Sequence, residues 1–168
     1  LGQPLQYHYQ NRLLTKETFR TGLSFFFEYD RLDHTARCLR TWGDDGLYYR
    51  DIHYDLDNNI TTVADSRNNV ITYHHDGVVP HKIIDPLGNV TQIEYNEHAQ
   101  IVREVNPLGN ATLYAYDERG NMVSMRSSNF RTMTRTYDEQ NRILTSRETW
   151  DGGWENTAYT YDEAGNRI

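Results

Sequence analysis

The sequence contains little of what several common classes of protein require. Only 37% of its 168 residues are apolar, and no run approaches the roughly 20 apolar residues of a membrane-spanning helix. The single cysteine, Cys38, excludes an internal disulfide. The net charge of −7 and the scatter of the arginines among acidic residues argue against nucleic-acid binding, which needs clustered basic residues. We therefore expect neither a membrane nor a nucleic acid as a partner.

What the sequence does contain is a repeated pair, an aromatic residue followed by an acidic or amide residue. His75-Asp76 and the degenerate Tyr9-Gln10 share its phase, and successive copies are 20 to 25 residues apart. A period of this size indicates a chain built from one supersecondary unit that stacks on its neighbours. The clear copies are Tyr29-Asp30, Tyr54-Asp55, Tyr95-Asn96, Tyr116-Asp117, Tyr137-Asp138 and Tyr161-Asp162.

Turn signals accompany each pair. The segments 85–89 and 106–110 read Asp/Asn-Pro-Leu-Gly-Asn and lie about ten residues before a pair, which then opens its own turn, as in 117–121. Asp or Asn can accept a hydrogen bond from the backbone two residues on, Pro presets φ, and Gly supplies a positive φ. The runs between turns, such as 132–137, are rich in Thr, Val, Ile and Tyr, as strands are. The repeat unit is therefore predicted to be a β-hairpin.

The predicted fold is all-β. Residues 1–168 are expected to form a single array of about seven hairpin repeats in a curved, spiralling sheet. The low apolar content and the 13 tyrosines fit a sheet with one or both faces in water, held by hydrogen-bonded ladders and cross-strand aromatic pairs. A compact sandwich is the competing architecture, but it would show cleaner alternation of apolar and polar residues.

The residues that define the repeat are expected to have structural roles. The tyrosine of each pair would bridge neighbouring strands, the aspartate would organise the turn, and glycine would supply its positive φ. This set comprises Tyr29, Asp30, Tyr54, Asp55, Tyr95, Tyr116, Asp117, Gly120, Tyr137, Asp138, Tyr161, Asp162 and Gly165.

No catalytic residue, cofactor or metal site is predicted. A catalytic thiol at Cys38 would need a base, and His34, four residues away, would not lie beside it on an extended strand. His74 and His75 are adjacent, so on a strand their side chains point to opposite faces and cannot share one ion.

Two periods are longer than the rest because of loops that contain tryptophan, at residues 41–46 and 149–154. Loop variation at a tolerant position explains them. The alternative is that Trp42, Trp150 and Trp154 contact a ligand, which would make the chain a carbohydrate- or protein-binding module. An enzyme, either a glycosidase or a self-cleaving protease, ranks below both.

The combination of Tyr-Asp-x-x-Gly-Asn with a preceding Asp-Pro-Leu-Gly-Asn resembles the YD repeats of Rhs proteins. Similar repeats occur in the toxin-enclosing subunits of insecticidal Tc complexes and, more distantly, in teneurins. Degenerate copies extend the resemblance over almost all of the chain, and its clearest parts are 85–89, Tyr95, 106–110, 116–121, Tyr137-Asp138 and 161–166. The resemblance implies a β-shell, in which a strip of hairpins winds around a hollow interior. In bacterial members the shell encloses a C-terminal polymorphic toxin, commonly delivered by type VI secretion.

The resemblance thus implies a non-catalytic structural module that forms part of the wall of such a shell. It implies the bacterial cytoplasm as the location before export, followed by contact-dependent secretion. The expected partners are the remaining shell repeats and the enclosed toxin, with self-association through open strand edges. The Pro-Leu-Gly segments continue into Asn89 and Asn110 instead of the Leu of the family's self-cleavage motif, so no protease residues are assigned. The chain is expected to be an internal fragment of a larger shell.

Overall fold

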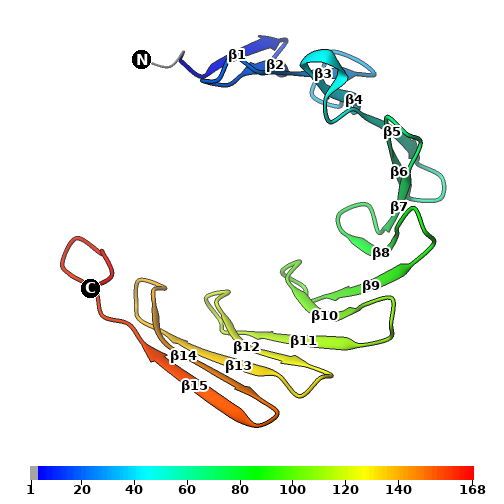
Figure 1. Cartoon of the computed structure of the whole chain (residues 1–168). Coiled ribbons are helices and arrows are strands. Elements are labelled where there is room, and N and C mark those ends of the chain that lie inside the picture. Colours follow the sequence, from blue (N-terminus) through cyan, green and yellow to red (C-terminus); the bar gives the residue numbers. More distant parts are fainter. Residues whose placement is uncertain (1–3) are drawn as a thin grey trace. The chain divides into compact units, whose positions relative to one another are not determined.

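The computed structural model describes residues 4–168, and Figure 1 shows the strands that they form. These strands belong to two compact units. The first unit ends at Asn89, and the second spans Val90–Ile168. The first contains β1 (Gln6–Gln10), β2 (Leu13–Thr18), β3 (Ser24–Tyr29), β4 (Cys38–Gly43), the 3-10 turn η1 (Asp44–Gly46), β5 (Arg50–Asp55), β6 (Ile60–Asp65), β7 (Val70–His75) and β8 (Pro80–Ile84). The second contains β9 (Val90–Tyr95), β10 (Ile101–Val105), β11 (Ala111–Tyr116), β12 (Met122–Ser127), β13 (Thr132–Tyr137), β14 (Ile143–Trp150) and β15 (Gly153–Ala158).

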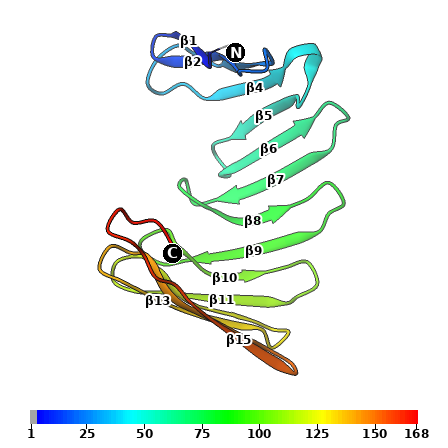
Figure 2. The same cartoon turned by 60° about the vertical axis from the view of Figure 1, so that its left-hand side comes forward.

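Within each unit, every strand pairs antiparallel with the strand that follows it in the sequence (Figure 2). Each unit is therefore a meander of consecutive hairpins, which confirms the predicted all-β fold of tandem β-hairpins. Among residues 4–168 there is no helix long and apolar enough to cross a membrane.

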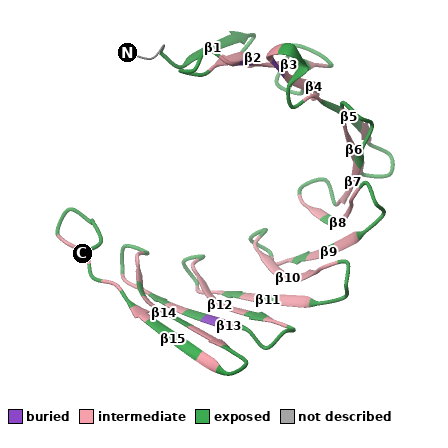
Figure 3. Ribbon diagram, viewed as in Figure 1, coloured by how far each residue is buried: buried purple, intermediate pink, exposed green. Residues whose placement is uncertain are grey.

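The strands of each unit form a single layer, so few side chains are buried (Figure 3). Among the described residues, Met133 is the one buried apolar side chain, at 6% exposure, and Ser24 is the one buried polar side chain. On β13, Met133 and Tyr137 are shielded while Thr134 and Thr136 on the other face are exposed. A sheet of this kind depends on its ladders and turns, because within each unit the described residues form no second layer.

A β-bulge recurs where the return strand of a repeat begins. Tyr116 pairs with Met122 and Ala115 pairs with Ser124, so Val123 is the extra residue. Such a bulge interrupts the ladder locally and increases the twist of the strand. The same register shift follows the turns after β1, β3, β7, β9 and β13, whereas the β5–β6 hairpin is regular.

Candidate functional site

The turn after β11 shows how the aspartate of a repeat acts. Asp117 Oδ1 accepts hydrogen bonds from the backbone N–H groups of Arg119, at 3.0 Å, and Asn121, at 2.8 Å. Its Oδ2 accepts a third from the Asn121 side-chain amide at 3.1 Å. The backbone closes the same loop, since Gly120 N–H donates to the Asp117 carbonyl at 3.0 Å. The aspartate therefore satisfies the N–H groups that a five-residue turn would otherwise leave unpaired.

The same two bonds, from the backbone N–H groups two and four residues further on, occur in the turns that the Tyr-Asp pairs open and in the turns about ten residues before those pairs. The residue just before the end of the turn has a positive φ, as glycine at Gly120 (85°), as asparagine at Asn141 (61°) and as alanine at Ala99 (57°). Asparagine also replaces aspartate at the first position in two turns. The residues that accept both bonds are Asp65, Asp85, Asn96, Asn106, Asp117 and Asp138.

These bonds stabilise the ionised carboxylates. The side-chain amide of Asn121, together with the backbone N–H groups of the turn, lowers the pKa of Asp117 below its ordinary value. The pKa of Asp85 is lowered in the same way by Asn89, and that of Asp162 by Asn166. At Asp138, desolvation acts in the opposite direction, but bonds from the Arg142 backbone and guanidinium outweigh it and lower the pKa.

Five tyrosines of the repeat tie their hairpins to the preceding one. Tyr116 donates a 2.9 Å hydrogen bond from its hydroxyl to the carbonyl oxygen of Ile101, at the start of β10. The ladder between β10 and β11 begins only at the Arg103–Leu113 pair, so the Ile101 carbonyl lies beyond it. The tyrosine hydroxyl replaces the missing ladder bond. Equivalent bonds of 2.8 to 2.9 Å join Tyr29 to Leu14, Tyr54 to Cys38, Tyr137 to Met122 and Tyr161 to Ile143.

Side chains also connect successive turns of the second unit. In two cases the last residue of one turn donates a hydrogen bond to the fourth residue of the turn in the following repeat. Gln100 Nε2 donates to the Gly120 carbonyl at 3.1 Å, and Asn121 Nδ2 donates to Asn141 Oδ1 at 2.9 Å. These repeats are therefore attached to their neighbours at the turn as well as at the tyrosine.

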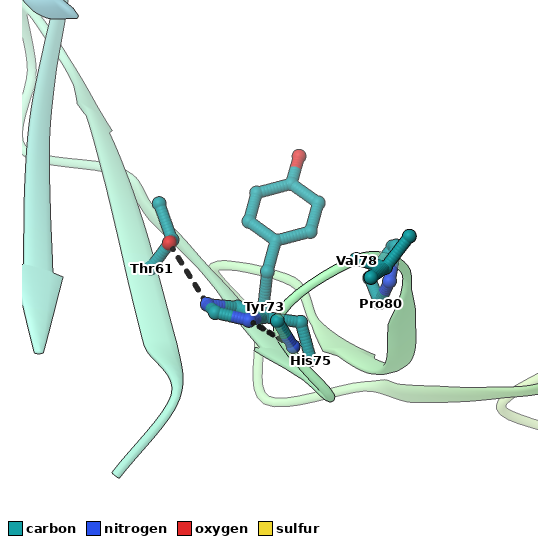
Figure 4. Close-up of a pocket in the computed structure, with 6 residues that line it drawn as sticks. Thr61, Tyr73, His75, Val78 and Pro80 are labelled. Atoms are coloured by element: carbon teal, nitrogen blue, oxygen red, sulfur yellow. Dashed lines mark hydrogen bonds between the residues drawn. The ribbon is translucent and has the colours of Figure 1, made fainter. Parts of the chain in front are cut away.

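His75 takes the place of tyrosine in one repeat of the first unit. Its Nε2 lies 3.3 Å from Thr61 Oγ1, and its Nδ1 accepts a 3.1 Å bond from Gly77 N–H (Figure 4). A cavity of about 300 Å³ opens beside the ring, lined by Thr61, Tyr73, His75, Gly77, Val78 and Pro80. Among these six residues none carries a carboxylate or a thiol, so the cavity presents aromatic and aliphatic surface with one imidazole.

Tyr73 and His75 line the same cavity, so the imidazole of His74, which lies between them on β7, projects from the opposite face. Among residues 4–168 no three His, Cys, Asp or Glu side chains are grouped so that they could hold a metal ion. Cys38 is half-buried, and this burial raises the pKa of its thiol.

The three tryptophans do not form one surface. Trp42, in the first unit, stacks on Phe26 across the β3–β4 pair, with ring centroids 5.6 Å apart. Trp154 is 64% exposed and pairs with Thr149 of β14. Trp150 follows Thr149 on β14 and pairs with Gly153. Trp150 and Trp154 therefore lie on opposite faces of the β14–β15 hairpin.

The fold and these linked turns define a tandem β-hairpin repeat protein. Comparison with known families makes the assignment specific: residues 95–129 match the RHS Repeat. The chain thus carries a repeat of the Rhs, or YD-repeat, type, as its sequence pattern predicts. The matched segment contains Tyr116 and Asp117.

Solved structures with a similar chain path include the Tc holotoxin pore of Photorhabdus luminescens (TM-score 0.43) and the TcdB2-TccC3 complex (TM-score 0.42). Each is 12% identical, and the match covers 93% of this chain but only 12% of the other. The chain thus spans about an eighth of the length of these proteins. No curated protein matches it.

Proposed function

We propose that the chain is a structural, non-catalytic module that forms part of the wall of an Rhs-type shell. The observation that carries the proposal is the hydrogen bond from five of the repeat tyrosines to a carbonyl at or next to the start of the preceding return strand. Bonds of this kind join hairpins into a strip, and the single layer of each unit gives extended surface in place of a buried core. Such a strip suits a barrier.

The RHS repeat at residues 95–129 supports a bacterial toxin shell as the setting. In this proposal the remaining shell repeats continue the strip, and the enclosed cargo is a C-terminal polymorphic toxin. The shell would assemble in the bacterial cytoplasm and leave through a type VI secretion system, with delivery on contact. An isolated strip would self-associate through its open strand edges.

Limited proteolysis of the polypeptide that contains this chain tests the proposal. A toxin segment enclosed by the wall resists trypsin while the shell is intact. Replacing Tyr116 and Tyr137 together by alanine removes two successive links between hairpins, and the toxin segment should then be digested much faster. The control is Tyr114→Phe, which lies on the same strand as Tyr116 and removes no hydrogen bond recorded among residues 4–168. A toxin segment that is cut equally fast in all three proteins would contradict enclosure.

A further inference from the structure

A polar cavity of about 270 Å³ lies on one face of β13, β14 and β15, apart from the repeat tyrosines and aspartates. Two rows of directly paired residues line it. Arg135, Ser146 and Thr157 form one row, Glu148 and Glu155 form the other, and Tyr159 completes the lining. All of these residues belong to the second unit.

Arg135 contributes a cation without a partner. Within residues 4–168 its guanidinium makes no hydrogen bond or ion pair, and its Nε is shielded from solvent. A guanidinium carries five N–H donors in a planar fork that matches a carboxylate. Shielded donors left unpaired are costly, and native structures rarely retain them. The cavity therefore lacks an anionic acceptor at this end.

In the other row, one of the two carboxylates lacks a cationic partner. Glu148 and Glu155 are directly opposite on neighbouring strands, where Cβ atoms lie about 5 Å apart and like charges repel. Arg131 Nη2 binds Glu148 Oε2 at 2.6 Å, but within the described residues Glu155 has no ion-pair partner. One positive group between these carboxylates would relieve the repulsion.

The row of Arg135, which needs an anion, and the row of Glu148 and Glu155, which needs a cation, are two residues apart along the strands. This is a separation of about 7 Å at 3.4 Å per residue. A simple anion would be repelled by the glutamates, and a simple cation would be repelled by Arg135. A molecule with both charges satisfies both rows, and the hydroxyls of Ser146, Thr157 and Tyr159 supply further hydrogen bonds. The volume lies near the lower limit for ligand pockets, which suits a small molecule.

We propose that this cavity binds a small zwitterion of the α-amino acid class. The ligand carboxylate pairs with Arg135, and the ligand ammonium lies between Glu148 and Glu155. The site is independent of the proposed wall function, because it uses none of the bonds that link the hairpins.

Binding is tested with three matched probes followed through the backbone amide signals of Ser146 and Thr157 in an NMR titration. L-Alanine carries both charges, L-lactate replaces the ammonium by a hydroxyl, and ethylamine lacks the carboxylate. The expected result is saturable binding of L-alanine, with affinity lower by about tenfold or more for each of the other two. Absence of saturable shifts with L-alanine, or equal binding of L-lactate or ethylamine, would overturn the proposal.

Variants assign the two ends of the ligand. Arg135→Gln and Glu155→Gln should each weaken L-alanine binding by about tenfold. Glu163→Gln, which neutralises an exposed turn glutamate outside the cavity, should leave it unchanged. If Arg135→Gln disturbs the fold, Arg135→Lys keeps the charge but loses the planar fork and should give an intermediate loss. Unchanged affinity in Glu155→Gln, with its spectrum otherwise intact, would exclude the assignment.

Discussion

The hydroxyl of Tyr116 is bonded to the carbonyl of Ile101, and Ile101 is the residue that Tyr95 of the preceding repeat pairs with. The relationship recurs, because Tyr137 binds Met122, which pairs with Tyr116. It holds in the first unit as well, where Tyr29, Tyr54 and their acceptors Leu14 and Cys38 follow the same rule. Each of these tyrosines therefore donates its hydrogen bond to the residue that pairs, across the strands, with the aromatic residue of the preceding repeat.

Removal of one such hydroxyl should weaken the fold. Tyr116→Phe leaves the Ile101 carbonyl without its donor, and we expect the free energy of unfolding to fall by about 1 kcal/mol in a denaturant titration. Tyr116→Ala also removes the half-buried ring and should cost about 1–3 kcal/mol. Tyr114→Phe is the control, since within residues 4–168 its hydroxyl makes no recorded hydrogen bond. Equal losses in Tyr114→Phe and Tyr116→Phe would exclude a specific role for the bond.

The turn aspartates make stability depend on acid. Their pKa values in the folded chain are below the ordinary value of 3.8, so the folded state binds fewer protons than the unfolded state near that pH. The stabilisation is present above the ordinary pKa and is lost as the pH falls through the folded pKa. The melting temperature should therefore change little between about pH 7 and pH 5 and fall below about pH 4.

Asp117→Asn removes the charge of the carboxylate but keeps an oxygen that can accept the backbone hydrogen bonds of the turn. Asparagine makes the same backbone bonds at Asn106, so this variant should keep the turn and show a smaller loss of melting temperature on acidification. Asp117→Ala should lower the melting temperature already at neutral pH. An acid profile of Asp117→Asn identical to that of the parent chain would contradict this account.

Substitutions of two glycines at the same turn position distinguish the cost of backbone strain from the cost of steric crowding. Gly109 has a φ of 81° with open space around it, whereas a Cβ on Gly120, at 85°, would lie 3.2 Å from Gln100 Nε2. Gly109→Ala should cost about 1 kcal/mol from the left-handed backbone alone. Gly120→Ala should cost more, because Gln100 must also move. Gly109→Asn should be nearly neutral, since Asn141 adopts this conformation, and a large loss there would refute the argument from φ.

The sequence predicted the local features well because they depend on neighbouring residues. The aspartate, proline and glycine of segment 85–89 predict its turn, and the spacing of Tyr95, Tyr116 and Tyr137 predicts hairpins. The register bulge at Val123 was not predicted, since it depends on which residues meet across two strands. The acceptor of each tyrosine hydroxyl was missed for the same reason.

The candidate sites were harder to predict than the fold. Arg135, Ser146 and Thr157 are each 11 residues apart, and only the pairing of three strands brings them into one row. The faces of Trp150 and Trp154 likewise follow from the register of a single hairpin. A polar run at alternate positions on β14, at Ser146 and Glu148, was the one signal that could have indicated the cavity.

Cys38 reports on the junction between repeats. Burial raises the pKa of its thiol, which lowers the thiolate fraction at neutral pH, and thiolate is the reactive species. We expect its reaction with dithiobis(nitrobenzoate) to be much slower in the folded chain than in denaturant. Tyr54→Phe removes the bond to the Cys38 carbonyl and should accelerate the reaction, whereas Tyr7→Phe should not. A thiol that reacts as fast in the folded chain as in denaturant would contradict the burial.

The proposed wall function is tested most directly by the mass of the polypeptide that contains this segment in its source cells. An antibody raised against the 168-residue chain, whose mass is 19.8 kDa, detects that polypeptide in an immunoblot. The account predicts a band far above this mass, whose sequence continues beyond these repeats into a toxin domain. A native product of about the mass of the chain alone would contradict the shell and indicate a free-standing repeat protein.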